Sequence, residues 1–563
     1  MKKFIVLFLL FTFAVNANYN DSKKEDVKLV LQITVDQLRG DIINKFKDKF
    51  SENGINFLLR NGLLFSDAHY EHAVTKTAPG HATLATGTSP STHGIIGNDW
   101  YDINKKTSVY NSEDKAHKIL NDESDKVGRS PKNLLASTTA DEIAASSNFK
   151  SKVYTVSVKD RGAIFLAGFS GKAFWYDKSN GGFTSSDYYY KELPKWASEW
   201  NDKKTTDDYI EEGWNLLLER SQYIYPDTTS YEKQVESLGS TFPYNLSKVD
   251  RKEMYDLIPY TPIGDKITAE FAEEIIKNEG LGDDNYVDYL SISFSCTDYI
   301  GHLYSPTTME YEDQILNLDR TLEKFFAFID KEIGLQNVLI VLSADHGVCD
   351  APEYLKENGF EFAGVAGIGN VRKEINKWAR DKYKLESNII LKSMMPYFYI
   401  DVNLLKEKNL DVCEIENEIR SMILEVDGIY EVYTSCQILV EQDPNDGVLE
   451  KVKKSFYKER SGQIYIVAKP FYYLTETTEY RGSAATHGSP WNYDTYVPII
   501  FVGPEIPHGN SGTKVSPKDI AKTICNYLGI SSPSSADGKV LINFNSNGNW
   551  KKILNWYYSF WIG

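Results

Sequence analysis

Cysteine is scarce in this sequence, which contains five in 563 residues: Cys296, Cys349, Cys413, Cys436 and Cys525. So few cysteines in a chain of this length do not form the dense disulfide framework of small secreted domains. Because the number is odd, at least one thiol stays unpaired within a single chain. The sequence alone does not decide whether any two of the others form a disulfide.

Positive charge is also in deficit. Lysine and arginine number 62 against 79 aspartate and glutamate, which gives a formal net charge of −17. Such a surface repels nucleic acids and anionic lipids, so we expect no nucleic-acid partner. Any anion-binding site must therefore be built locally from a few cationic groups. The sequence does not settle the oligomeric state, and a monomer is one option.

A long hydrophobic run is missing too. The apolar stretch FIVLFLLFTFAV, at residues 4–15, is shorter than the about 20 residues that a membrane-spanning helix needs. It follows two lysines and precedes the small-residue sequence VNA, which is the pattern of a cleavable secretory signal peptide. We therefore predict a signal peptide over residues 1–17, no stable membrane anchor, and a periplasmic or secreted mature protein.

Five short runs rich in β-branched and aromatic residues predict buried strands. They lie at residues 28–36, 152–160, 286–298, 337–345 and 495–503. Amphipathic helical patterns separate several of them, for example at 264–280 and 309–334. This alternation predicts an α/β fold, with a mainly parallel central sheet and helices on both faces. In such folds ligands bind beyond the carboxyl ends of the strands.

Two segments interrupt the alternation. Residues from about 185 to 260 are aromatic and charged but poor in strand patterns, and we interpret them as an insertion. Residues from about 352 to 480 carry a pattern of their own, which predicts an inserted α+β subdomain. Its expected elements are strands at 396–402, 429–440 and 462–474 and a helix at 413–426. The catalytic domain is expected over 28–550, between an N-terminal segment at 18–27 and an aromatic tail at 551–563.

Aspartate and histidine collect where the predicted strands end or in the loops beside them. The residues are Asp36, Asp298, His302, Asp345, His346 and His487. Crowded buried carboxylates repel one another unless cations neutralise them. Mixed aspartate and histidine ligands without cysteine suit zinc, and six ligands suit two ions rather than one. Two metal ions can hold both the attacking and the leaving oxygen of a phosphoryl transfer, which indicates that chemistry.

A threonine is placed where an anion would be held. In the segment HAVTKTAPGHATLAT, Thr77 comes two residues before Pro79, and proline is favoured in the first turn of a helix. Thr77 is thus expected to begin a helix, whose N-terminus attracts anions through its free N–H groups. A metal-bound hydroxyl ionises readily and becomes a nucleophile near neutral pH, so Thr77 is the candidate nucleophile.

As a set, these motifs resemble the alkaline phosphatase superfamily, and most of all its periplasmic, phosphate-irrepressible members. They read ITVDQLRGD, KTAPGHATLATGTSPSTHGIIGNDWYD, VKDRGAIFLAG, CTDYIGH, SADHG and THGSPWNYD, in the family's order. The resemblance implies a zinc-dependent phosphate monoester hydrolase that acts on small molecules through a covalent phosphothreonine at Thr77. It implies two zinc ions, one held by Asp298, His302 and His487 and the other by Asp36, Asp345, His346 and Thr77.

The resemblance also assigns residues to the phosphoryl group. Asn98 resembles the family's amide donor to a phosphoryl oxygen. Lys159 and Arg161 are two residues apart, so on an extended segment both face the same way. Together they offer a point charge and a planar fork to phosphoryl oxygens. We find no separate carboxylate cluster for a third, magnesium, site, and the lysine and the arginine would fill that side.

Other members of the superfamily fit less well. Sulfatases require a cysteine or serine nucleophile and an arginine where this chain has His81, and the related phosphoglycerate mutases use serine and are cytosolic. The nucleotide pyrophosphatase/phosphodiesterase branch shares the threonine, the asparagine and the six ligands but lacks the Lys-x-Arg pair, so it is the main alternative. A periplasmic anion- or zinc-binding protein without catalysis is a further one, although binding alone does not require Thr77. We interpret His81 and His93 as packing or backbone-bonded residues.

Overall fold

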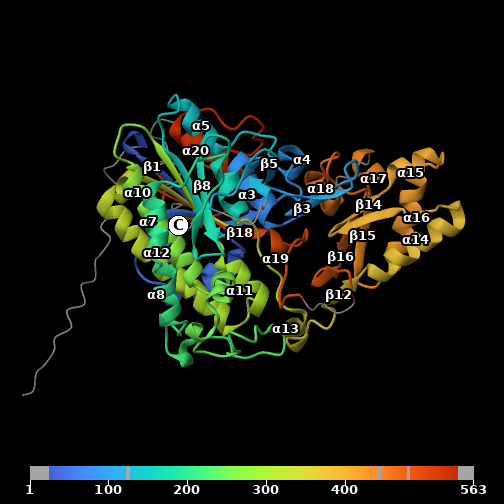
Figure 1. The fold of residues 1–563 in the computed structure, drawn as a ribbon, viewed down its shortest axis with the longest axis horizontal. Helices are drawn as coiled ribbons and strands as arrows, with labels where there is room; N and C mark the ends of the chain where they lie inside the picture. Colours follow the sequence, from blue (N-terminus) through green and yellow to red (C-terminus); the bar gives the residue numbers. More distant parts are fainter. Residues whose placement is uncertain (1–23, 122–126, 441–442, 444, 478–481, 543–563) are drawn as a thin grey trace, which may run out of the picture.

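The computed structural model describes residues 24–121, 127–440, 443, 445–477 and 482–542 (Figure 1). The predicted signal peptide at 1–17 and the predicted aromatic tail at 551–563 lie outside these residues. Every helix in the described part of the chain is too short or too polar to cross a bilayer.

A nine-stranded mixed sheet, in the order β19-β2-β18-β11-β1-β10-β7-β8-β9, forms the core of the molecule. Five consecutive strands run parallel: β11 (Val338–Ser343), β1 (Leu29–Val35), β10 (Asp288–Phe294), β7 (Val153–Ser157) and β8 (Lys172–Asp177). The flanking strands are β18 (Tyr496–Val502), β2 (Gly62–His69), β19 (Gly509–Val515) and β9 (Gly182–Thr184). All five predicted strands are present, and the predicted α/β class is confirmed.

Strand β1 shows why helices cover both faces of this sheet. Leu29, Leu31 and Ile33 belong to one hydrophobic cluster, whereas Val30 belongs to another. Successive side chains of a strand point to opposite faces, so a strand that is apolar throughout needs cover on both. The first cluster includes residues of α10 (Ile263–Glu279) and α12 (Met309–Glu332). The second includes residues of α3 (Thr77–Thr86), α5 (Thr139–Ser146) and α20 (Asp519–Leu528).

The segment at 185–260 forms helices that pack against the main core. They are α7 (Lys195–Asp202), α8 (Thr205–Glu212) and α9 (Arg251–Leu257). Trp200 and Trp214 belong to the same hydrophobic cluster as β1 and α12. The Trp214 indole N–H also donates a hydrogen bond of 2.7 Å to Asp313 in α12. The aromatic residues of this segment therefore extend the main core rather than forming a separate one.

The second interrupting segment forms the predicted α+β subdomain, drawn in yellow and orange at the right of Figure 1. Its antiparallel sheet has the order β13 (Ile390–Met394), β14 (Tyr397–Ile400), β16 (Ile464–Ala468) and β15 (Ile429–Thr434). Helices α14 (Gly369–Tyr383) and α16 (Val412–Leu424) share its hydrophobic cluster. Strands β12 (Gly364–Gly367) and β17 (Tyr472–Thr475) form a separate parallel pair.

Two predicted strands of the subdomain differ from the structure. The one predicted at 462–474 is divided into β16 and β17, which belong to different sheets. The one predicted at 429–440 is wrong in its second half. The chain leaves β15 at Thr434, and residues 435–440 form helix α17 (Ser435–Val440) instead of continuing the strand to 440. Thr434 and Gln437 exchange side-chain and backbone hydrogen bonds, each of 3.1 Å. This reciprocal pair is a capping box, which starts a helix although the residues that follow are apolar.

A disulfide joins two helices of the subdomain. Cys413 in α16 is bonded to Cys436 in α17. Cys296, Cys349 and Cys525 are buried free thiols. The pairing settles what the cysteine count left open.

The remaining described helices and strands lie in the segments that connect the elements above. They are α1 (Gly40–Phe46), α2 (Ile55–Asn61), α4 (Pro90–His93), α6 (Asp160–Ala167), α11 (Cys296–Tyr304), α13 (Pro352–Glu357), α15 (Val402–Glu407), α18 (Gly447–Ser455) and α19 (Asn492–Thr495), with the hairpins β3 (Asp99–Asp102) with β4 (Thr107–Tyr110) and β5 (Glu113–Lys118) with β6 (Val127–Arg129), and short 3-10 turns.

A buried carboxyl in α12 makes stability depend on pH. Burial raises the pKa of Glu310 to about 8, and its Oε1 accepts a hydrogen bond of 2.7 Å from the Tyr244 hydroxyl. The folded state thus keeps a proton that the unfolded chain releases near pH 4.5, so stability falls as pH rises from there to about 8. We expect Glu310→Gln to raise the free energy of unfolding at pH 9 by about 2–4 kcal/mol, because the amide keeps the shape and cannot ionise.

Thermal unfolding of both proteins at pH 9 and at pH 5 tests this expectation. At pH 5 the Glu310 carboxyl is protonated in the folded wild type, so the gain should almost vanish. An equal gain at both pH values would contradict a titration effect and point to packing instead.

Candidate active site

The predicted ligands meet at the carboxyl edge of the parallel strands. Asp36 directly follows β1, and Asp345 and His346 follow β11. After β10 the chain enters α11, which carries Asp298 and His302 one turn apart on the same face, as the spacing predicted. Asp36, Asp345 and His346 are fully buried.

The ligand atoms of Asp298, His302 and His487 lie close together and form a first group. The Nε2 atoms of His302 and His487 lie 3.2 Å apart, and Asp298 Oδ1 is 3.3 Å and 3.4 Å from them. The Nδ1 atoms face backbone carbonyls of Ala485 and Thr75, at 2.8 Å and 2.7 Å. Since a carbonyl only accepts, each Nδ1 carries the proton and each Nε2 offers a lone pair. Two facing lone pairs and a carboxylate oxygen fit a cation between them.

A second group of atoms converges beside the first. His346 Nε2 lies 3.4 Å from Asp36 Oδ1 and 3.5 Å from Asp345 Oδ2. All three atoms are buried and make no hydrogen bond within the described structure, which is costly unless a cation completes them. Burial and the neighbouring Asp345 raise the pKa of Asp36, and burial lowers the pKa of His346 to about 3. Asp298 also lies within reach of this group. The donor set of nitrogen and carboxylate oxygen suits zinc at both places.

Gln37 ties the two groups together, although no motif singled it out in advance. Its backbone adopts a left-handed conformation with φ of 70°, which is uncommon for a residue other than glycine. In this conformation its backbone N–H donates to Asp345 Oδ1 at 3.1 Å, while its side-chain amide donates to Asp298 Oδ1 at 2.7 Å. Its place directly after Asp36 was the one available signal. Gln37 therefore positions two carboxylates.

Thr77 is the first residue of α3, as predicted, and its side chain is buried. Asn98 Oδ1 accepts the N–H of Ala78 at 3.0 Å, which leaves the NH₂ group of Asn98 available to a ligand. At Gly80, an added Cβ would lie 2.2 Å from the carbonyl oxygen of Asp345. The helix can therefore approach the Asp345 backbone this closely only with glycine at that position.

The two other histidines near this helix have the structural roles that we assigned to them. His81 Nδ1 lies 2.9 Å from the Thr77 carbonyl, and Nε2 lies 2.8 Å from the Ser293 hydroxyl. His81 Nδ1 is also 3.2 Å from Asp345 Oδ2. His93 bonds to Thr83 and to the Ile95 backbone.

The segment with Lys159 and Arg161 is not extended as expected. Lys159 is the N-cap of α6 and Arg161 lies in its first turn, because Gly162 and Ala163 donate their N–H groups back to the Lys159 carbonyl. The Lys159 ammonium contacts Asp36 Oδ2 at 2.6 Å and also Asp298, and lies 3.5 Å from Thr77 Oγ1. Despite burial, these carboxylates raise the pKa of Lys159.

Arg161 lies on the helix rather than on a strand, near enough to Lys159 for its positive charge to act against the raised pKa of that lysine. Its guanidinium donates to the Tyr110 hydroxyl at 3.3 Å, whereas its buried Nε has no partner in the described structure. A further cation, Lys178, follows β8 at the same sheet edge and was not selected from the sequence. Lys178 and Lys159 lie 5.3 Å and 5.0 Å from the centre of the same ring, that of Tyr299. Several cations thus gather locally in an acidic protein.

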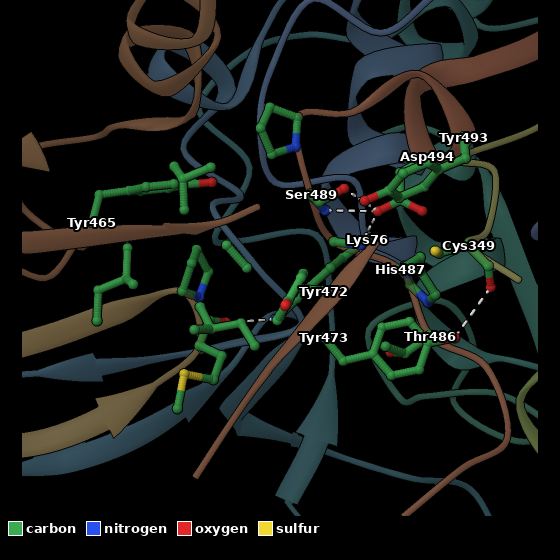
Figure 2. A pocket seen from close by; sticks show the side chains of 18 residues that line it. Lys76, Cys349, Tyr465, Tyr472, Tyr473, Thr486, His487, Ser489, Tyr493 and Asp494 are labelled. Carbon is green, nitrogen blue, oxygen red and sulfur yellow. Dashed lines mark hydrogen bonds between the residues drawn. The ribbon is translucent and has the colours of Figure 1, made fainter. Parts of the chain in front are cut away.

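A cavity of about 190 Å³ adjoins these residues, between the subdomain and the catalytic part of the chain. Lys76 and His487 line it together with tyrosines of the subdomain, among them Tyr472 and Tyr473 (Figure 2). Because His487 also belongs to the first ligand group, the cavity opens directly beside that group.

Comparisons with known proteins agree with this geometry. The type I phosphodiesterase/nucleotide pyrophosphatase family model matches residues 30–490. The alkaline phosphatase PafA of Elizabethkingia meningoseptica is 35% identical over 522 residues, covering 91% of this chain and 93% of that protein. The alkaline phosphatase PhoV of Synechococcus elongatus is 32% identical over 519 residues, covering 91% and 92%. A crystal structure of wild-type alkaline phosphatase PafA matches with a TM-score of 0.85 at 33% identity and covers 92% of this chain and 98% of that chain.

The chain therefore belongs to the type I phosphodiesterase/nucleotide pyrophosphatase family, within the alkaline phosphatase superfamily. Inside this family it resembles alkaline phosphatases over nearly its whole length, in sequence and in fold, and it is an enzyme of that type. The predicted superfamily is thus confirmed.

Proposed function

We propose that the chain is a zinc-dependent phosphate monoester hydrolase that works through a covalent phosphothreonine at Thr77. The observation that carries the proposal is the position of the Thr77 hydroxyl. It lies at a helix N-terminus, 3.5 Å from a lysine that contacts two of the candidate metal ligands. The relatives named alkaline phosphatase, which cover more than nine-tenths of the chain, support the same activity.

In the proposed reaction, Thr77 Oγ attacks phosphorus and the hydroxyl proton passes to solvent. The new Oγ–P bond forms as the bond to the leaving oxygen breaks, and the leaving alcohol takes up a proton. Water then hydrolyses the phosphothreonine and releases phosphate. Bound zinc would lower the pKa of the hydroxyl and neutralise charge on the phosphoryl oxygens.

The protein's own groups hold the phosphoryl oxygens during both steps. The Asn98 NH₂ group, the Lys159 ammonium and the Arg161 guanidinium offer donors on the side of Thr77. In this proposal His302, His487 and Asp298 hold one ion, and Asp36, Asp345 and His346 the other.

The main alternative is a nucleotide pyrophosphatase or phosphodiesterase, since the matched family carries that name. The Lys159 and Arg161 pair favours monoesters, because only a monoester has a third free phosphoryl oxygen to accept from it. Purified enzyme should therefore hydrolyse p-nitrophenyl phosphate far faster than methyl p-nitrophenyl phosphate, which has the same leaving group. The reverse preference would replace the proposal by the alternative.

We expect metal analysis of the purified protein to give about two zinc ions per chain, and chelation to abolish activity that added zinc restores. His487→Ala should lower the zinc content towards one ion per chain, because two ligands of that group remain. His508→Ala, at an exposed histidine, is the matched control and should keep both ions. Full activity of the wild type in chelator would contradict the two-metal site.

A further inference from the structure

Two parts of the chain line the cavity beside His487, each on one side. The subdomain contributes Met395, Tyr472 and Tyr473, and the catalytic part contributes Lys76 and residues of the segment at 486–494, which includes the start of α19 (Figure 2). Its volume of about 190 Å³ is the share of about six water molecules in the liquid. That is below the several hundred Å³ of pockets for drug-sized ligands, so the cavity suits a compact group.

Lys76 places a cation in this cavity that makes no close ion pair; burial lowers its pKa, and the more distant Asp99 partly offsets that effect. Its ammonium donates to the Met395 carbonyl at 2.7 Å, and no carboxylate of the described residues lies within ion-pairing distance. An ammonium has three donors, so further acceptors can bind. Asp494 also lines the cavity; its Oδ2 accepts from the backbone N–H groups of Gly488 and Ser489 and from the Ser489 hydroxyl, whereas its buried Oδ1 has no partner in the described structure. A partly buried cation bonded to a carbonyl alone is stabilised by an anion brought next to it.

The cavity also lies on the side where a leaving group would extend. Lys76 directly precedes Thr77, so their Cα atoms are about 3.8 Å apart. The wall residue His487 belongs to the ligand group that the resemblance does not pair with Thr77, so in our proposal this group is the one left for the leaving oxygen. Aromatic walls lower the local dielectric, which strengthens an ion pair with Lys76.

We propose that this cavity, the Lys76 pocket, is a subsite for a second anionic group on the leaving group of the substrate, a carboxylate or a phosphate. The inference rests on the proposed function, since it names a substrate class for the same site. Compact phosphate monoesters that carry a second negative charge are then preferred over neutral ones of the same size.

A matched pair of substrates tests the pocket. In 2-phosphoglycolate the leaving group ends in a carboxylate, and in ethyl phosphate it ends in a methyl group. Ethane-1,2-diyl bisphosphate extends the comparison to a second phosphate. We expect Lys76→Met to lower the ratio of kcat/KM for phosphoglycolate to that for ethyl phosphate by about tenfold or more, the effect of one charge-assisted contact. Lys76→Arg keeps the charge and should keep most of the ratio.

Lys172→Met is the matched control, because Lys172 also donates to a backbone carbonyl, that of Tyr189, but lies outside the pocket. Its ratio should equal that of the wild type. Tyr472→Glu, which puts a carboxylate into the pocket wall, should lower the ratio without touching the lysine. Tyr472→Glu therefore still tests the subsite if Lys76→Met does not fold. An unchanged ratio in folded Lys76→Met, with both substrates turned over, overturns the subsite. A wild type that hydrolyses none of the three substrates instead contradicts the proposed function.

Discussion

Thr77→Ala should lower kcat for phosphate monoesters by about four orders of magnitude or more, the scale seen when a nucleophile is removed from a working site. The expectation follows from the burial of Thr77 at the start of α3, within 3.5 Å of the Lys159 ammonium. Alanine keeps the helix but supplies no oxygen to attack phosphorus. Zinc content should stay near that of the wild type, because Asp36, Asp345 and His346 still form their group.

Thr77→Ser is the matched control, since it keeps the hydroxyl and loses only a methyl group. It should retain substantial activity. Rapid acid quenching with labelled substrate, followed by peptide mapping, should find phosphate on Thr77 in the wild type and on the introduced serine in this variant. Phosphate on another residue, or full activity in Thr77→Ala, would exclude the proposed nucleophile.

The strands that could be predicted from the sequence differ physically from those that could not. β1, β10 and β11 are buried at every position, because helices cover both of their faces, and the run of apolar residues is visible in the sequence. β19 reads GNSGTKV and is mostly exposed at the edge of the sheet, so it has no apolar pattern. It becomes a strand by pairing with β2, a contact between residues far apart in the sequence.

The candidate site likewise has features that could be predicted from the sequence and features that could not. Ligand types and spacings, such as Asp298 and His302 one turn apart, are local properties and could be read in advance. The contacts of Gln37 depend on a left-handed backbone that no residue type reveals here. Arg161 was expected on an extended segment, yet the chain turns into α6 directly after Lys159. Strand ends could be located from the sequence, but the direction in which the chain leaves them could not.

The second large effect concerns the choice between monoesters and diesters. A monoester dianion presents one more free and charged oxygen than a diester of the same alcohol. Because Lys159 lies 3.5 Å from Thr77 Oγ1 and the buried Nε of Arg161 has no partner in the described residues, we propose that both donate to that oxygen. A charge-assisted contact is worth about 1.5–3 kcal/mol, and a tenfold change in rate corresponds to about 1.4 kcal/mol.

We therefore expect Lys159→Ala/Arg161→Ala to lower kcat/KM for p-nitrophenyl phosphate about 100-fold or more, and for its methyl diester far less. Lys159 also contacts Asp36 and Asp298, so its loss can disturb the metal ligands as well. Arg161→Ala alone separates the effects, because Arg161 contacts neither carboxylate. It should cost the monoester about tenfold or more at unchanged zinc content. Arg60→Ala, at an arginine half exposed on the surface, is the control and should change neither rate. If Arg161→Ala lost both activities equally, the arginine would support the structure of the site rather than select the monoester.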